Sequence, residues 1–127
     1  MHLWLMDNLP LTTVRVGYRG AAIEVSNVLV DTGSGATVIS ADVTSKIGIL
    51  PSEKDVLYSI RGVGGSEVVF ARKVDYLEVG ERRIPDFEIE VGGMEYGFEI
   101  NGILGMDFLM KAGAIINLRE MRIEFAE

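Results

Sequence analysis

The sequence predicts an all-β domain with one or two short helices. Its 127 residues and mass of 13.9 kDa match the common size of one domain. Fifteen glycines beside many valines and isoleucines indicate strands joined by tight turns. Residues 12–18 alternate apolar and polar side chains, as a half-buried strand does. With no internal repeat and no linker, we expect a single domain over residues 1–127, with residues 1–10 as an N-terminal extension.

Short strands and one helix are predicted in the first half of the chain. Arg19-Gly20 has the composition of a turn between two strands. Ser40 is placed to begin a helix over residues 41–47, which Gly48 would end. The predicted strands are residues 12–18, 21–24, 27–31 and 37–40.

The second half continues the strand pattern around a glycine-rich loop. Residues 61–66 contain three glycines and join two predicted strands. Residues 105–112 predict a second helix, with Asp107 in its first turn, where a negative charge complements the helix dipole. The predicted strands are residues 56–60, 68–79, 83–91 and 100–104, followed by a hairpin of 113–118 with 121–126.

Composition excludes several classes of function. A net charge of −7 argues against a nucleic-acid surface and gives a weak bias toward neutral or basic partners. Without cysteine there is no disulfide framework, thiolate zinc site or cysteine nucleophile. The lone histidine, His2, lies in a terminus that we expect to be mobile, so a histidine-based triad or multi-histidine metal site is not expected. No segment has the pattern of a secretory signal or membrane span, and the expected location is cytoplasmic.

Asp31-Thr32-Gly33 is the segment that points to catalysis. It follows the apolar run Val28-Leu29-Val30 and occurs once. Two carboxylates a few ångströms apart share one proton and can act together as acid and base. Hydrolysis of an amide by water needs both roles. An ordinary turn at a strand end has the same composition. If the pair exists, its second carboxylate must come from another chain.

Three segments in a fixed order resemble the retropepsin-like aspartic proteases. They are Asp31-Thr32-Gly33, the glycine-rich segment 60–66, and the apolar-apolar-glycine sequence that leads into a helix within 102–109. The resemblance spans about residues 12–125. It implies a small closed β-barrel-like domain that acts as a homodimeric aspartic endopeptidase on an extended peptide or protein, with no metal or cofactor, no nucleic acid and no membrane.

The resemblance also implies roles for individual residues. Asp31 would be the catalytic aspartate, Thr32 would grip the partner's turn through its hydroxyl, and Gly33 would contact the substrate backbone. Residues 103–105 would pack beneath the turn, and residues 62–64 would form the tip of a flap. The full set implied to contact a peptide is Leu29, Ser34, Val38, Ile60, Gly62, Val63, Gly64 and Ile103.

The chain departs from the retroviral members of this family at the dimer interface. Gly35 and Met106 occupy the positions of an acidic and an arginine residue that form an ion pair there, so that pair cannot form. The extra C-terminal hairpin leaves the mode of dimerisation open. Ser34 suggests a further hypothesis, in which its hydroxyl donates to Asp31 and favours the charged carboxylate.

An alternative from another class stays open. The same domain could be a catalytically weak or inactive dimeric peptide-binding or assembly module. A fold-only relative acting within a larger complex is a third interpretation. The scattered acidic residues Glu88, Glu90, Glu95 and Glu99 are interpreted as solvated positions of the strand-rich surface rather than a cation site.

Overall fold

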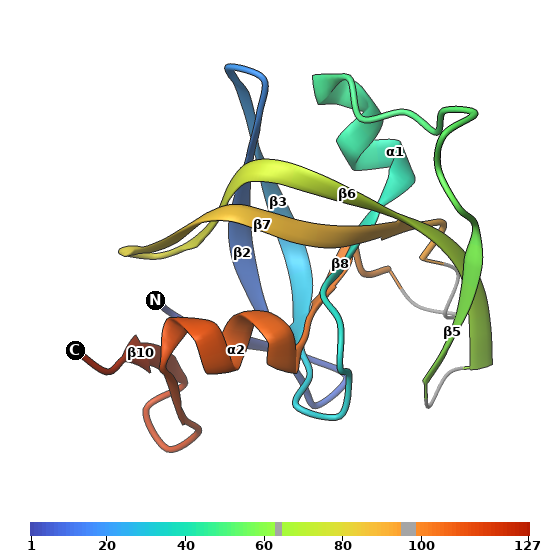
Figure 1. The fold of residues 1–127 in the computed structure, drawn as a ribbon. Helices are drawn as coiled ribbons and strands as arrows, with labels where there is room; N and C mark the ends of the chain where they lie inside the picture. Colours follow the sequence, from blue (N-terminus) through green and yellow to red (C-terminus); the bar gives the residue numbers. More distant parts are fainter. Residues whose placement is uncertain (63–64, 95–98) are drawn as a thin grey trace.

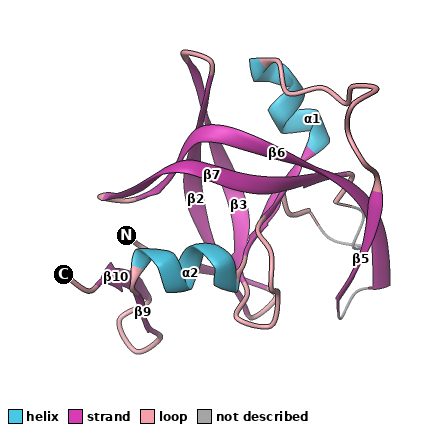
Figure 2. Ribbon diagram, viewed as in Figure 1, coloured by secondary structure: helices cyan, strands magenta, loops and turns pink. Residues whose placement is uncertain are grey.

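The computed structural model describes residues 1–62, 65–94 and 99–127, and within these ranges the side chains of all residues except 60–62 and 65–67. Strands dominate, with two short α-helices, which confirms the predicted class (Figure 2). The helices are α1 (Ala41–Thr44), which continues into a 3-10 turn (Ser45–Ile47), and α2 (Met106–Ala112). The strands are β1 (Trp4–Met6), β2 (Leu9–Tyr18), β3 (Ala21–Val30), β4 (Val38–Ser40), β5 (Tyr58–Gly62), β6 (Gly65–Val79), β7 (Arg82–Gly92), β8 (Gly102–Leu104), β9 (Ala114–Asn117) and β10 (Arg122–Phe125).

The main sheet closes on itself. Its eight strands follow the order β1-β2-β3-β8-β4-β7-β6-β5. β2 also pairs with β6, with Val16 opposite Leu77, so the strands from β2 to β6 in this order form a ring. The closed barrel-like domain expected from the family resemblance is therefore present (Figure 1). β9 and β10 form a separate antiparallel pair.

The ring encloses the larger of two apolar clusters. Alternate residues of β2, β6 and β7 point inward, as the side-chain period of two requires. α2 packs against this cluster with Phe108, Leu109 and Ala112 on its buried face, and Gly113 ends the helix in the left-handed conformation. The ring of Phe108 meets that of Phe87 edge to face at 5.8 Å. This packing attaches α2 firmly to the inner face of β7.

One long strand replaces two predicted ones. Residues 21–24 and 27–31 were expected as separate strands, but β3 runs without a break from Ala21 to Val30. Its pairing with β2 shifts register between Thr12 and Val14. Asn27 takes a positive φ of 56° near this shift, a conformation that asparagine tolerates better than most residues. A bulge therefore lies where the sequence suggested a gap.

The N-terminal segment is part of the fold, so the prediction of a mobile extension is wrong. Leu3 is buried, and its N–H donates to the carbonyl of Met121 at 2.8 Å. His2 forms a bridge with Arg122 of the C-terminal hairpin. β1 pairs with the start of β2, which begins earlier than predicted. Long-range contacts hold this segment, and a local sequence pattern does not reveal them.

Other boundaries differ locally. β5 begins at Tyr58, and Val56, expected inside the strand, is 75% exposed. The glycine-rich loop is shorter than predicted, because Gly62 pairs with Gly65 at the end of the β5–β6 hairpin. The Ser40 side chain makes no capping hydrogen bond to α1, although the residue does precede the helix. Within the described ranges, no helix is long and apolar enough to cross a membrane.

Candidate active site

Asp31 lies at the end of β3, where the backbone turns sharply. Its N–H donates to the carbonyl of Leu104 at 3.0 Å, which continues the pairing of β3 with β8. Its own carbonyl accepts a hydrogen bond from the Ser34 N–H at 3.2 Å. The Gly33 N–H donates to Asp31 Oδ1 at 2.8 Å and so orients the carboxylate. None of the described hydrogen bonds involves Oδ2, which leaves that oxygen available to another group.

Residues 103–105 support this turn from below, as the family resemblance implies. β3 and β8 run parallel, with Val30 opposite Leu104. The Met106 N–H donates to the carbonyl of Ser34 at 2.8 Å. A Cβ atom on Gly105 would lie 2.4 Å from the carbonyl oxygen of Ala36, so only glycine permits this approach. The turn is thereby held by backbone contacts on both sides.

Thr37 and Asp107 form the polar link between the turn and α2. Asp107 Oδ1 accepts hydrogen bonds from Thr37 Oγ1 at 2.7 Å and from the Phe108 N–H at 2.7 Å. Asp107 Oδ2 accepts from the Thr37 N–H at 3.1 Å. Thr37 Oγ1 in turn accepts from the Gly105 N–H at 3.0 Å. Asp107 is thus the helix-terminal acid predicted for it, and it also anchors the segment that follows Asp31.

The tip of the turn faces outward from the chain. Thr32, Gly33 and Gly35 are exposed, whereas Asp31 and Ser34 are half-buried. No described hydrogen bond within the chain involves the Thr32 hydroxyl. The turn therefore combines a rigid base, fixed by β8 and α2, with an open outer face (Figure 1).

Ser34 does not make the bond suggested for it. Its hydroxyl donates to the carbonyl of Ala36 at 2.8 Å. A hydroxyl carries a single hydrogen, so it cannot also donate to Asp31 in this arrangement. The hydroxyl stabilises the loop itself, and the hypothesis that it tunes the Asp31 carboxylate is wrong for this conformation.

Three of the predicted peptide-contacting residues lie together on one face of the sheet. Val38 and Ile103 belong to the second apolar cluster, and Leu29 packs against it. Leu29 is half-buried, while Val38 is fully buried. Val38 therefore lies on this face but is covered by its neighbours and offers no surface of its own for a direct contact, contrary to its predicted role, and Ile103 is only 9% exposed. A row of cross-strand neighbours continues through Leu11, Leu29, Ile103, Val38, Glu90 and Ala71.

Apart from Ser34, which lies in the turn after β3, the remaining predicted peptide contacts fall at the hairpin. Val63 and Gly64 lie outside the described residues, as does the side chain of Ile60. Gly62 is in β5, paired with Gly65. In Figure 1 the β5–β6 hairpin points toward the lower edge of the view, where the turn after β3 also lies.

Glu90 also belongs to this region, although no pattern in the sequence indicated it. It lies on β7, where alternation with the buried Ile89 and Val91 suggested only a solvated face. In the structure it is half-buried and accepts a hydrogen bond from the Tyr58 hydroxyl of β5. Burial is the largest cause that raises the pKa of Glu90 above its ordinary 4.5, and the Tyr58 hydrogen bond opposes this rise. Burial and the adjacent carboxylate raise the pKa of Tyr58 above 10.0, so the phenol remains a donor.

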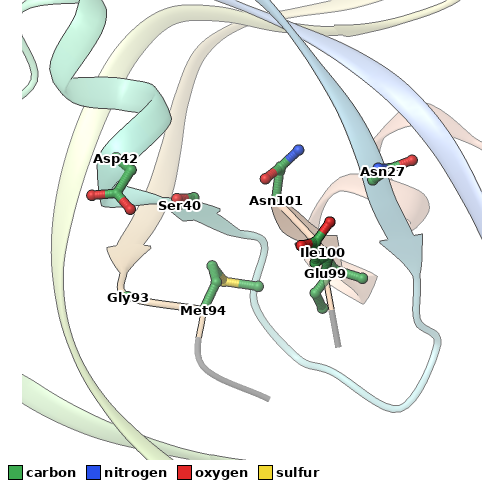
Figure 3. Close-up of a pocket in the computed structure, with 8 residues that line it drawn as sticks. All are labelled: Asn27, Ser40, Asp42, Gly93, Met94, Glu99, Ile100 and Asn101. Atoms are coloured by element: carbon green, nitrogen blue, oxygen red, sulfur yellow. The ribbon is translucent and has the colours of Figure 1, made fainter. Parts of the chain in front are cut away.

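A separate pocket of about 260 Å³ lies at the other end of β4 and β8 from Asp31 (Figure 3). Two of its polar residues are engaged in the fold: the Asn101 side chain donates to the carbonyl of Ser26 at 2.9 Å, and the Ser40 N–H donates to the carbonyl of Asn101. It brings no acid–base pair together. In the described ranges, no group of three or more acidic or histidine side chains is arranged to hold a metal ion.

Comparison with known families identifies a match over most of the chain. A family model described as aspartyl protease matches residues 13–108. The matched region includes Asp31, the β5–β6 hairpin and the Gly105 turn, and it ends inside α2. No curated protein matches the sequence.

Proposed function

The chain belongs to the aspartyl protease family, and from that premise we propose that it is a retropepsin-like aspartic endopeptidase that works as a homodimer. The observation that carries the proposal is the single Asp31 turn, rigid at its base and exposed at its tip. One carboxylate cannot supply both the acid and the base of this reaction. A two-fold axis beside the turn brings a second Asp31 to the first.

The two Asp31 side chains share one proton in this mechanism. The ionised carboxylate takes a proton from a water molecule held between them, and the water oxygen attacks the peptide carbonyl carbon. The protonated carboxyl gives its proton to the carbonyl oxygen. Collapse of the tetrahedral intermediate then releases the amine, which receives a proton from the pair. The Gly33 N–H holds Oδ1 in place during these transfers, and Thr32 hydroxyls link the two turns.

The substrate lies extended between the turns and the β5–β6 hairpins. An extended peptide pairs with backbone N–H and carbonyl groups in the manner of an added strand. The hairpins close over it and exclude water from the reacting bond. Leu29, which is half-buried, contributes apolar surface beside the turn and packs against the cluster that contains the buried Ile103.

The proposal is tested by cleavage of an unfolded protein or peptide library in mild acid. Asp31→Asn is expected to reduce turnover by at least about a hundredfold, because amide side chains cannot exchange the proton. Circular dichroism and size measurement are expected to be unchanged. Asp42→Asn, an exposed aspartate in α1, serves as the matched control.

Two outcomes would contradict the proposal. Turnover in Asp31→Asn equal to that of the wild type would remove the mechanism. Tight binding of peptides by a dimer that cleaves none of them would favour the alternative of a binding or assembly module.

A further inference from the structure

Glu90 is the one charged member of the row of cross-strand neighbours that runs past Asp31. It lies opposite Val38 of β4 on one side and Ala71 of β6 on the other. Directly opposed residues on adjacent strands project from the same face of a sheet. Glu90 therefore shares its face with Leu29 and Ile103, the apolar residues beside the turn.

The carboxylate of Glu90 is held in place but retains capacity to bind. An ionised carboxylate has two oxygens with about four acceptor positions. The Tyr58 hydroxyl occupies one of these, on Oε2. Among the described contacts, Oε1 has no hydrogen-bond donor, and none of the described ion pairs includes Glu90.

Tyr58 connects this carboxylate to the hairpin that covers the substrate in the proposed function. It is the first residue of β5 and is paired with Val69 of β6. Its hydroxyl bond orients Glu90 from the hairpin side, while the backbone of β7 fixes it from the sheet side. The Glu90 N–H also donates to the carbonyl of Thr37, at 2.9 Å, on the segment that follows the turn.

We propose that Glu90 is a specificity-determining residue that selects peptides with a lysine or arginine side chain close to the cleaved bond. This inference rests on the proposed function. The alkyl stem of lysine or arginine lies along the apolar face beside the turn, where Leu29 is half-buried and Ile103 is almost fully buried, and its charged end donates to Glu90 Oε1. An apolar side chain of the same length contacts the same stem-binding surface but leaves Glu90 Oε1 without a donor.

The selection depends on pH because Glu90 must be ionised to attract a cation. The groups that face it are Tyr58 from β5, Glu88 on its own strand, and Asp107 from α2, with Lys73 of β6 opposite Glu88. Preference for the basic peptide therefore increases as pH rises through the titration of Glu90. The shared proton of the Asp31 pair affects both peptides equally, so it cancels from their ratio.

The test uses pairs of peptides that are identical except at one position, which holds lysine in one peptide and norleucine in the other. One pair is made for each position around a single cleavage site. At one position, kcat/KM for the lysine peptide is expected to exceed that for norleucine by roughly tenfold near neutral pH. Glu90→Gln is expected to bring the ratio to about one. Glu88→Gln, which alters the neighbouring exposed carboxylate, is the matched control and is expected to leave the ratio intact.

A binding measurement separates this inference from the proposed function. Calorimetric Kd values for the same peptides are measured with Asp31→Asn, alone and combined with Glu90→Gln. A lysine preference that disappears with Glu90→Gln supports the inference even if the wild type cleaves nothing, in which case the proposed function alone fails. Equal affinity and equal turnover for lysine and norleucine at every position would overturn the inference, as would a preference that survives in Glu90→Gln.

Discussion

Thr37 and Asp107 are seventy residues apart in the chain, yet Thr37 Oγ1 donates to Asp107 Oδ1 at 2.7 Å. Thr37 is fully buried, and its N–H also donates to the same carboxylate. This contact joins the segment after Asp31 to the first turn of α2. Since α2 is fixed to the core through Phe108, the position of the turn is linked to the packing of the whole barrel.

Asp107→Asn is expected to lower the free energy of unfolding by about 1–3 kcal/mol. The amide has a single acceptor oxygen, so it cannot accept from Thr37 Oγ1, the Thr37 N–H and the Phe108 N–H together. Urea unfolding measures the change. Asp42→Asn removes an acid from the first turn of the other helix, where no side-chain bond is made, and should change stability by less than about 0.5 kcal/mol. Equal effects of the two substitutions would contradict the role assigned to Asp107.

Gly105→Ala is expected to destabilise the fold by about 1–3 kcal/mol, because the new methyl group would press against the carbonyl of Ala36. Thermal unfolding at equal protein concentration is the measurement. Gly35→Ala is the control, since its Cβ would meet no atom within 4 Å in the chain. If Gly105→Ala is as stable as Gly35→Ala, the close approach of the two segments is not as described.

Phe108→Ala should cost about 3–5 kcal/mol, since it removes a fully buried ring and its edge contact with Phe87. Met110, on the same helix, is 73% exposed, and Met110→Ala should be nearly neutral. Chemical unfolding of both variants provides the comparison. A small cost at Phe108 would mean that α2 is not packed into the core.

Asp55→Asn should destabilise the fold at neutral pH and have little effect in strong acid. The Ser52 N–H is the largest cause that holds the pKa of Asp55 below 3.8; burial opposes it, and Arg72, 2.8 Å away, lowers the pKa further. Because the pKa of Asp55 is lower in the folded state, the ionised carboxylate stabilises the fold above pH 3.8. This stabilisation is lost as the pH falls through the pKa of Asp55 in the folded state. Urea unfolding of wild type and variant across this range measures it. Glu24→Gln, at an exposed ion pair, is the control expected to show little change. A difference between Asp55→Asn and wild type that does not vary with pH would refute the assignment.

Local patterns in the sequence predicted the parts of the fold that local chemistry determines. The apolar run before Asp31 forms the end of β3, and Gly113 follows α2 as a helix-ending residue. The position of residues 103–105 under the turn came from the family resemblance. The bulge near Asn27 was missed because a bulge interrupts alternation in the same way as a loop does.

Long-range contacts account for the other differences. Leu3 is held by Met121, a contact that no short segment encodes. Glu90 was interpreted as part of a solvated strand face because the residue that donates a hydrogen bond to its carboxylate, Tyr58, is distant in sequence. The sequence allows the Ser34 hydroxyl two acceptors, the Asp31 carboxylate and the Ala36 carbonyl. The backbone path of residues 34–36 determines that it donates to Ala36.

The central claim is that each active site needs one Asp31 from each of two chains, and subunit mixing tests it most directly. Wild type and Asp31→Asn are mixed in equal amounts, allowed to exchange subunits, and assayed at constant total protein. If both carboxylates are required, only wild-type homodimers are active. The mixture should then show about one quarter of the activity of wild type alone at the same total protein concentration. A residual activity of about one half would mean that each chain acts independently, and the account would then be wrong.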